Sequence, residues 1–274
     1  MPIPSDPSDA IDTSRPSLAR VYDCALGGKD NFEVDRELRR RINEAVPEAR
    51  TIALTSRAFL VRAVRFLARE AGIDQYLDCG SGLPTAENTH QIARRVNPEA
   101  QVVYVDNDPT VAAHSRALLA DNDRSHFLDA DIFEPSRVLD DPLVREKLDF
   151  TRPLALLQVG TLHHYDEASR SRPAADVVRE YVEALPSGSF VAFSHFFDPE
   201  DEHSVHARRV QELLGSGLGS GFFRTRAELE AMLASLDLLD PGLVVTDAWW
   251  PDGPRLAPLP AAGRCVAAAV GRKP

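Results

Sequence analysis

Short apolar runs alternate with amphipathic segments along most of the chain. The apolar runs are rich in valine, leucine and alanine and have the length of buried strands, whereas the segments between them carry apolar residues at helical spacing. The predicted strands are 75–79, 101–106, 126–130, 153–159, 189–195, 243–249 and 264–270. The predicted helices between them are 86–96, 109–120, 173–184, 203–214 and 225–236. This alternation predicts a parallel sheet with helices on both faces.

The last two predicted strands are connected in a different way. The segment between them, 251–260, is rich in proline and has no helical pattern. A loop without a crossover helix suits an antiparallel pair, because a parallel pair needs a longer connection. We therefore predict an α/β fold built on a seven-stranded, mostly parallel sheet that has one antiparallel strand.

The beginning of the chain has another pattern. Residues 1–16 are rich in proline, serine and aspartate, which predicts a disordered arm. Apolar residues then recur at helical spacing over 17–71, with a pause at Gly27-Gly28. We therefore predict an N-terminal helical cap over 17–71, followed by a larger ligand-binding domain over 72–274.

The predicted cap contains a helix over about 33–45, which ends before Pro47. The last helix of the predicted cap spans about 49–71. Arg62, Arg65 and Arg69 fall away from its apolar stripe, so we expect these side chains to face solvent. The stripe, which we expect to be buried, consists of Phe59, Leu60, Ala63, Val64 and Leu67.

Charge and cysteine content narrow the class of protein. The 274 residues carry 31 basic and 42 acidic side chains, a formal net charge of −11. Binding through phosphates needs clustered cations, so this balance disfavours nucleic acid as a partner. Cys24, Cys79 and Cys265 lie far apart, which favours free thiols in a reducing compartment. No apolar run is long enough to span a membrane and the first residues lack a signal-peptide pattern, so we expect a cytoplasmic protein.

A glycine-containing loop follows the first predicted strand. The sequence Asp78-Cys79-Gly80-Ser81-Gly82 leads from that strand toward a helix. Glycines let the backbone turn sharply and let a ligand approach it closely, at the edge where open α/β sheets bind ligands. A dinucleotide fingerprint that starts at Gly80 needs its third glycine at the position of Thr85, so a nucleotide-dependent oxidoreductase is disfavoured. Asp78, two residues before Gly80, can instead attract an ammonium group of a ligand. The alternative for the glycine loop is a plain tight turn that binds no ligand.

Acidic residues follow the next two predicted strands. Asp106 ends the second strand, where a carboxylate is placed to accept hydrogen bonds from both hydroxyls of a ribose. Asp108 and Pro109 have the pattern of a helix start, so we expect Asp108 to cap that helix. Asp131 follows the third strand, where it can accept a hydrogen bond from an adenine amino group. The two strand ends therefore indicate sites for a ribose and an adenine.

The glycine loop and these acids resemble the successive motifs of class I S-adenosylmethionine-dependent methyltransferases, which have a Rossmann-like fold. The motifs are Asp78-x-Gly80-x-Gly82, Asp106 and Asp131. Three further segments resemble one subfamily, actinobacterial proteins first described as a domain of unknown function: 16–32, 82–90 and 104–109. The resemblance covers nearly the whole chain and implies S-adenosylmethionine as the cofactor of 72–274. It implies no particular methyl acceptor.

The resemblance also implies contacts with the adenosine part of the cofactor. Asp106 would hold the ribose and Asn107 would lie beside the adenine. Asp131 would accept a hydrogen bond from the adenine amino group, and the backbone N–H of Ile132 would contact a ring nitrogen.

Other residues are implied at the methionine part and in the cap. Asp78 would lie near the methionine amino group, with Gly80-Ser81-Gly82 beneath the cofactor. Two residues at the end of the fourth strand would line the methionine end, Gln158 and Val159. The cap would act as a lid, in which Tyr22 contacts the cofactor and Gly28 allows close backbone approach. The alternative for the cap is a helical appendage that only covers the sheet.

Histidines are the candidates for acid–base chemistry. Methyl transfer from a sulfonium needs alignment and exclusion of water, and it needs a base only where the acceptor must lose a proton. His163 and His164 follow the fourth strand, in a loop that faces the acceptor in many class I methyltransferases, and either is a candidate base. The alternative is that one packs and the other is solvated. His195 is a candidate for substrate contact, and His203-x-x-His206 lacks the partners of a metal site, so we expect no metal.

We therefore expect methyl transfer from S-adenosylmethionine to a small-molecule acceptor. The alternative is a non-catalytic regulatory protein that binds S-adenosylmethionine, because no catalytic motif is obvious. Methylation of nucleic acid is disfavoured, since residues 158–161 read Gln-Val-Gly-Thr where a Pro-Pro-Tyr type tetrapeptide is expected for that activity. The acceptor and the oligomeric state stay open.

Overall fold

The central sheet contains 8 strands in the order β3-β2-β1-β4-β5-β8-β6, with β7 also paired to β8. It is seen in a computed structural model, which describes residues 11–84, 87–119 and 122–274. The strands are β1 (Gln75–Cys79), β2 (Gln101–Asp106), β3 (Ser125–Asp129), β4 (Ala155–Val159), β5 (Phe190–Phe196), β6 (Asp237–Leu238), β7 (Val244–Val245) and β8 (Val266–Arg272). The α-helices are α1 (Leu18–Leu26), α2 (Glu33–Ala45), α3 (Arg50–Arg69), α4 (Thr89–Arg94), α5 (Pro109–Leu119), α6 (Pro135–Leu139), α7 (Pro142–Lys147), α8 (Glu167–Arg170), α9 (Ala174–Ala184), α10 (Ser204–Leu218) and α11 (Arg226–Met232).

Strands β1 to β5 run parallel to one another, and β8 runs antiparallel to β5. The predicted α/β fold with a mostly parallel sheet is therefore confirmed. β1 pairs with β2 on one side and with β4 on the other, so the strand order reverses at β1. In open α/β sheets, ligands bind at the carboxyl ends of the strands beside such a reversal.

The edge of the sheet beside β8 differs from the sequence prediction. The single strand expected over 243–249 is reduced to β7, because the chain enters a 3₁₀ helix at Thr246 and buries Trp249. The sequence did not predict β6, which pairs with the other end of β8. Two short strands, separated by a turn that contains Gly242 with a φ of 79°, thus take the place of one. The sheet consequently has 8 strands instead of seven, and β8 is the reversed one.

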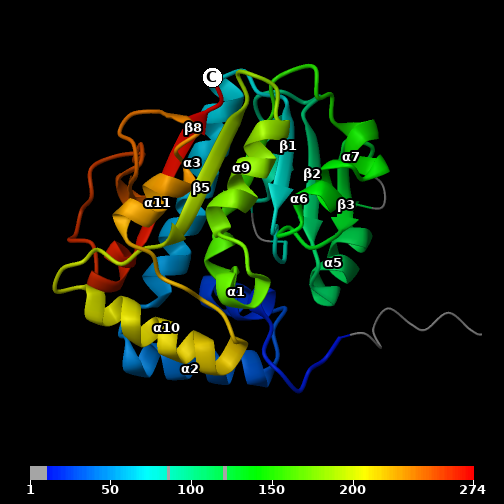
Figure 1. The fold of residues 1–274 in the computed structure, drawn as a ribbon. Coiled ribbons are helices and arrows are strands. Elements are labelled where there is room, and N and C mark those ends of the chain that lie inside the picture. Colours follow the sequence, from blue (N-terminus) through cyan, green and yellow to red (C-terminus); the bar gives the residue numbers. More distant parts are fainter. Residues whose placement is uncertain (1–10, 85–86, 120–121) are drawn as a thin grey trace, which may run out of the picture.

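Helices cover both faces of the sheet (Figure 1). Helices α6, α7, α9 and α11 contribute to the core on one face, and α3 and α4 contribute to the core on the other. Within β1, Leu77 belongs to the first core and Tyr76 to the second, as the alternation of side chains along a strand requires. Both faces are apolar, which explains why the parallel strands read as continuous apolar runs.

A third core lies between the cap and one end of the sheet. In Figure 1, α2 and α10 lie side by side below the strands, and their facing side chains belong to this core. Gly217 of α10 allows the close approach, since a Cβ there would lie 2.7 Å from Cδ1 of Leu38 in α2. The cap is therefore built from two distant parts of the chain, and α10 was not expected in it.

Helix α3 packs lengthwise along the sheet, with the predicted stripe buried. The expectation that Arg62 faces solvent is wrong, because the segment after β7 folds over this part of α3. The Arg62 guanidinium donates hydrogen bonds to the carbonyl oxygens of Trp249 at 2.9 Å and Thr246 at 2.6 Å. Arg69 is exposed, as expected. In the described part of the chain, no helix combines the length and the apolar character that crossing a membrane requires.

Part of the predicted arm lies outside the described residues, namely 1–10. Within the remainder, the carbonyl oxygens of Asp12 and Arg15 accept hydrogen bonds from Arg20 of α1. The boundaries predicted for the arm and the cap stay predictions.

Candidate active site

The glycine loop after β1 turns tightly against its neighbours. Gly80 has a φ of 76° and Gly82 a φ of 64°, in the left-handed region that favours glycine. The N–H of Gly80 donates to the carbonyl oxygen of Val105 at 2.7 Å. A Cβ on Gly80 would lie 2.3 Å from Cγ2 of Thr161. The glycine loop thus packs between β2 and the segment that follows β4. A residue larger than glycine at position 80 would clash with Thr161.

Two carboxyl groups lie at the ends of neighbouring strands β1 and β2. Asp78 is buried and accepts a hydrogen bond from the Thr89 hydroxyl at 2.6 Å, while burial raises its pKa to about 6. Asp106 accepts from the backbone N–H groups of Gly82 at 2.8 Å and Asp108 at 3.0 Å, and burial likewise raises its pKa to about 6. Because neither carboxylate has an ion-pair partner among the described residues, a cationic ligand would stabilise the ionised form of both.

Sequence reasoning missed Arg57 of α3 at this site. Its guanidinium donates to the carbonyl oxygen of Glu87, and its positive charge partly offsets the effect of burial on the pKa of Asp78. The same charge acts on Tyr22, whose pKa burial raises to about 12 and whose hydroxyl donates to the Ala53 carbonyl oxygen at 3.4 Å. No motif surrounds Arg57 in the sequence, so only its contact with Glu87 and its effect on Asp78 in the structure reveal it.

The predicted adenine contacts lie beyond β3. Oδ1 of Asp131 accepts from the N–H of Phe133 at 2.9 Å, and Oδ2 accepts from the guanidinium of Arg170 at 2.7 Å. An adenine amino group at Asp131 would therefore meet a carboxylate that is already paired with Arg170. Ile132 is buried, and its carbonyl oxygen accepts from the Tyr181 hydroxyl at 2.9 Å. Asn107 is exposed next to Asp106.

Unpaired polar atoms are concentrated where β1 and β4 end. Gln158 is 1% exposed, yet neither its amide nitrogen nor its amide oxygen has a hydrogen-bond partner among the residues that the structure describes. The hydroxyls of Ser81 and Thr161 are buried and also lack a partner in that part of the chain. Val159, the last residue of β4, is half-buried. Buried polar groups in folded proteins are normally paired, so this cluster has hydrogen-bonding capacity for a ligand.

Three histidines lie together where β4 and β5 end. The ring of His163 stacks on Phe196 with centroids 3.5 Å apart, and it lies 4.3 Å from His164 and 5.6 Å from His195. His164 Nδ1 is 3.0 Å from the hydroxyl of Ser220, in the glycine-rich segment after α10. His195 Nδ1 donates to the carbonyl oxygen of Phe196 at 2.7 Å. The structure thus brings the two predicted catalytic histidines together with His195.

Burial determines the charge of these imidazoles. It lowers the pKa of His164 and of His195 to about 3, and it lowers the pKa of His163 well below its ordinary value. All are neutral at pH 7, and a base is most effective when its pKa is close to the working pH. These rings are therefore better suited to hydrogen bonding than to full proton transfer.

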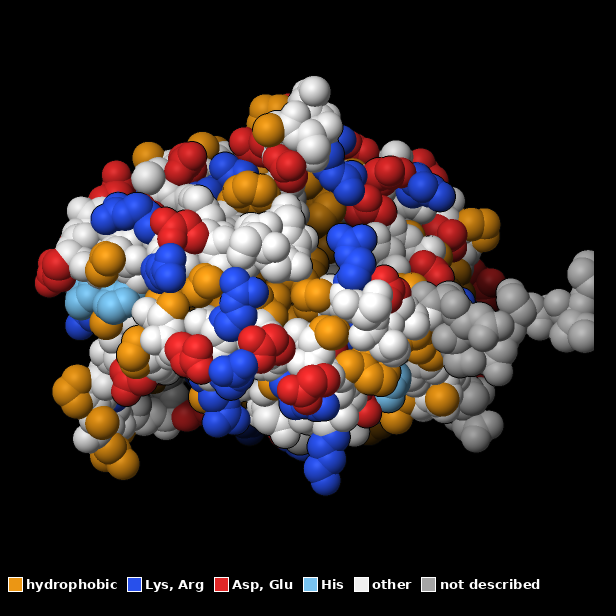
Figure 2. Space-filling view, turned by 90° about the horizontal axis from the view of Figure 1, so that it is seen from below, with side chains coloured by type: hydrophobic (Ala, Val, Ile, Leu, Met, Phe, Trp, Pro, Cys, Tyr) orange, Lys and Arg blue, Asp and Glu red, His pale blue; other side chains and the backbone are white. Residues whose placement is uncertain are grey.

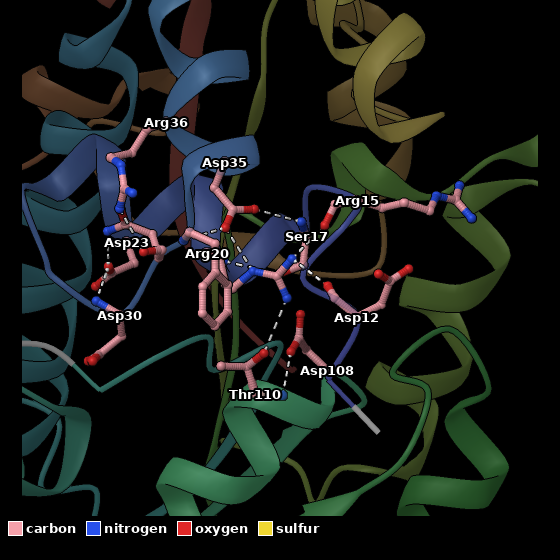
Figure 3. Close-up of polar contacts among 12 residues, drawn as sticks. Asp12, Arg15, Ser17, Arg20, Asp23, Asp30, Asp35, Arg36, Asp108 and Thr110 are labelled. Atoms are coloured by element: carbon pink, nitrogen blue, oxygen red, sulfur yellow. Dashed lines mark hydrogen bonds and ion pairs between the residues drawn. The ribbon is translucent and has the colours of Figure 1, made fainter. Parts of the chain in front are cut away.

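The turn at Gly27-Gly28 folds around Asp23 in the cap, since the N–H of Gly28 donates to the Asp23 carbonyl oxygen at 2.9 Å. Figure 3 shows the carboxylate of Asp23 beside Asp30. Oδ2 of Asp23 accepts from the N–H of Asp30 at 3.0 Å and from the amide of Asn31 at 2.8 Å. A Cβ on Gly28 would lie 1.8 Å from Oδ1 of Asp23. Close approach to this carboxylate explains a glycine at position 28, and its predicted contact with a cofactor stays a prediction.

The side chains of His203 and His206 lie near each other at the start of α10. The two rings face each other with centroids 6.5 Å apart. Among the residues that the structure describes, no group of three or more His, Cys, Asp or Glu side chains is arranged to hold a metal ion.

Comparisons with known proteins identify the family. Residues 4–274 match the family profile described as S-adenosyl methyltransferase. A solved structure from Thermobifida fusca YX, of a protein proposed to be a methyltransferase, is 42% identical with a TM-score of 0.89, and the match covers 96% of each chain. The structure of a DUF574 family protein from Streptomyces avermitilis MA-4680 is 37% identical with the same TM-score, and the match covers 96% of this chain and 99% of that one.

More distant structures share the fold alone. The mitomycin 7-O-methyltransferase MmcR is 17% identical, with a TM-score of 0.52 over 99% of this chain and 74% of that one. No curated protein matches the chain. The family match spans nearly the whole chain. The chain belongs to the S-adenosyl methyltransferase family, so its cofactor is S-adenosylmethionine and its reaction is a methyl transfer.

Proposed function

We propose that this methyltransferase holds S-adenosylmethionine across the carboxyl ends of β1, β2 and β4 and methylates a small-molecule acceptor beneath the cap. The observation that carries the proposal is the pair of carboxyl groups, Asp78 and Asp106, whose pKa values burial raises to about 6. Ionising both without a counter-charge is unfavourable, and the ammonium and sulfonium groups of the cofactor supply that charge.

The residues present fit this cofactor. Gln158 offers a buried amide and Ser81 a buried hydroxyl, and the described residues use neither for hydrogen bonds. Gly80 and Gly82 keep the loop free of side chains, so a ligand can lie against its backbone. The guanidinium of Arg57, close to Asp78, suits the carboxylate of the methionine part.

We assign the cofactor contacts as follows. Asp106 holds the ribose hydroxyls, because each carboxylate oxygen has a lone pair beyond the one that accepts a backbone N–H. Asp78 holds the methionine ammonium group, with Gln158 and Val159 beside it. Asp131 and its neighbour Ile132 face the adenine.

The remaining predicted contacts lie at the rim of the same site. Asn107 is exposed beside Asp106 and is free to lie along the adenine. Tyr22 of α1 is half-buried against α3, near Arg57, and it covers the methionine side. Gly28 is placed at the edge of the cap.

The histidine cluster supports an enclosed acceptor site. When bound, S-adenosylmethionine supplies an electrophilic methyl group on a sulfonium sulfur. His163 and His164 are neutral and accept a hydrogen bond from an O–H or N–H group of the acceptor, which aligns its lone pair with that methyl group. His163 is 4% exposed and His195 is 0% exposed, so an acceptor that reaches them must be small enough to be enclosed.

The surface of the cap supports the same class of acceptor. Seen from below, the described side chains of this face carry basic and acidic groups interspersed (Figure 2). Two arginines of α2 pair with acids on the same helix, Arg36 with Glu33 and Arg40 with Glu37 and Glu44. A nucleic acid requires a cluster of unpaired cations, which this face does not offer in the part that the structure describes.

Isothermal titration calorimetry and a transfer assay test the proposal. The purified protein should bind S-adenosylmethionine and not NAD. Label from S-[methyl-¹⁴C]adenosylmethionine should move to low-molecular-weight compounds when a metabolite extract is added. Binding without any transfer would favour the regulatory alternative, and label on nucleic acid or protein would contradict a small-molecule acceptor.

A further inference from the structure

The guanidinium of Arg20 joins separate parts of the chain (Figure 3). Its Nε donates to Oδ2 of Asp35 in α2 at 2.8 Å, and its Nη1 donates to the hydroxyl of Thr110 in α5 at 3.4 Å. Its Nη2 donates to the carbonyl oxygens of Asp12 at 3.0 Å and Arg15 at 2.6 Å. One side chain of the cap thus connects α1, α2 and the segment before α1 to a helix of the sheet domain.

On the side of the cap, this connection is buried, and the carboxylate of Asp35 accepts further hydrogen bonds from the cap. Arg20 is 3% exposed and Asp35 is 0% exposed. Asp35 also accepts from the backbone N–H groups of Ser17 at 3.0 Å and Phe32 at 2.8 Å. A buried ion pair is costly to break, because one charge then stays without a partner. The position of the Arg20 guanidinium is therefore fixed relative to the cap.

On the side of the sheet, the connection leads to the carboxylate assigned to the ribose. The N–H of Thr110 donates to Oδ1 of Asp108 at 2.7 Å, and the N–H of Asp108 donates to Oδ1 of Asp106 at 3.0 Å. The other oxygen of Asp106 accepts from Gly82 at 2.8 Å. A series of hydrogen bonds thus extends from the cap, through the turn 106–110, to the glycine loop.

We propose that Arg20 is a positioning residue for cofactor binding, which fixes the turn 106–110 against the cap so that Asp106 faces the ribose. The proposal rests on the proposed function, in which Asp106 holds that ribose. Arg20 acts through Thr110 and does not itself touch the cofactor. By linkage, a cofactor bound at Asp106 should in turn hold the cap and residues 11–17 in place.

The decisive variant is Thr110→Val. It removes the hydroxyl that Arg20 binds and keeps the Arg20–Asp35 ion pair and the backbone bond from position 110 to Asp108. We expect the dissociation constant of S-adenosylmethionine, measured by calorimetry, to increase by about threefold to tenfold, which corresponds to one hydrogen bond. The cofactor-free protein should stay folded, and its thermal unfolding midpoint should fall modestly, because Nη1 of Arg20 loses its acceptor. Arg20→Met should weaken binding further, by more than about tenfold.

The matched control is Arg39→Met. Arg39 is a second buried arginine of the cap and lies in α2; it is 7% exposed, and its Nη2 has no partner in the described structure. This variant disturbs the interior of the cap without touching the turn 106–110, so the affinity for S-adenosylmethionine should stay at the wild-type value. Amide hydrogen exchange over 11–17 and 106–110 should accelerate in Thr110→Val and stay unchanged in Arg39→Met.

Wild-type affinity in Thr110→Val would overturn the proposal, as would an equal loss in Arg39→Met. A failure of the proposed function has another signature. In that case the wild-type protein binds no S-adenosylmethionine, or Asp106→Asn binds it as tightly as the wild type does.

Discussion

The backbone N–H of Gly82 donates a hydrogen bond of 2.8 Å to Oδ2 of Asp106. This bond joins the glycine loop after β1 to the tip of β2, so two separate sequence motifs form one rigid unit. Asp106 is oriented by this bond and by the N–H of Asp108, which leaves its outer lone pairs available to a ligand. The arrangement preorganises the carboxylate before the cofactor arrives, which lowers the entropic cost of binding.

Asp106→Asn should weaken binding of S-adenosylmethionine by about tenfold to a hundredfold. The amide removes the negative charge and one acceptor, and hydrogen bonds to charged groups contribute about 1.5–3 kcal/mol each. Asp129→Asn is the matched control, because Asp129 lies directly beside Asp106 on β3 and is exposed to solvent. Calorimetry on both variants checks the prediction. Equal affinities of the two variants for S-adenosylmethionine would show that Asp106 does not contact the cofactor.

Cofactor affinity should increase with pH between 5 and 7. Burial raises the pKa of Asp78 and of Asp106 to about 6 from 3.8. A cationic ligand binds best when both are ionised, so the affinity at pH 5 should be at least about tenfold lower than at pH 7. The raised pKa values have the opposite effect on the stability of the cofactor-free protein. The contribution of Asp78 and Asp106 to that stability is largest below pH 3.8, and it is lost as the pH rises through 6.

Calorimetric titrations from pH 5 to 7.5, paired with thermal unfolding of the cofactor-free protein, check both directions. In Asp78→Asn the pH dependence of binding should be smaller than in the wild-type protein, because one titrating group is gone. A flat profile in the wild-type protein would contradict the raised pKa values.

The fold and the strand ends were predictable because the apolar runs and the glycine loop are local patterns. Helix α2 was predicted with its observed bounds, Glu33–Ala45, since amphipathic spacing and the following proline define it. The edge strand was not, because whether residues 243–249 pair with β8 or bury Trp249 is decided by distant contacts. The same holds for Arg62, which is buried only because a later segment folds over it.

At the candidate site, the sequence predicts the residues that lie in motifs. It does not predict the residues that only tertiary packing brings to the site. Arg57 comes from a helix far from the glycine loop in sequence, and α10 completes the cap from the second half of the chain. The lowered pKa values of His163 and His164 likewise follow from burial, which no local pattern reveals. The roles predicted for the cofactor contacts are still to be tested, and so is the catalytic role of these histidines.

Gly80→Ala should destabilise the protein by about 2 kcal/mol or more. A Cβ would lie 2.3 Å from Cγ2 of Thr161, and the φ of 76° is unfavourable for any other residue. Adding Thr161→Ser removes that methyl group, so the double variant should recover part of the loss and retain the backbone strain. Urea unfolding of the two variants and of Thr161→Ser alone measures the three values. Equal stability of Gly80→Ala and wild type would show that the loop is looser than the structure indicates.

Gln158→Leu should change stability and binding in opposite directions. Both amide atoms of Gln158 are buried and have no partner among residues 11–84, 87–119 and 122–274, and an unsatisfied buried polar group costs about 1–3 kcal/mol. Replacing the side chain with an apolar one of similar size should therefore raise the free energy of unfolding of the cofactor-free protein. The affinity for S-adenosylmethionine should fall by about tenfold, because the hydrogen bonds kept for the ligand are lost.

Gln75→Leu provides the contrasting control. Gln75 is 2% exposed on β1, but its Oε1 accepts from the N–H of Asp149 at 2.6 Å and its Nε2 donates to the carbonyl oxygen of Asp149 at 3.3 Å. Leucine there leaves that N–H unpaired, so the free energy of unfolding should fall by about 1–3 kcal/mol while cofactor affinity stays the same. Chemical unfolding and calorimetry on both variants make the comparison. If Gln158→Leu were destabilised as Gln75→Leu is, the amide of Gln158 would have partners within the protein and no role reserved for the cofactor.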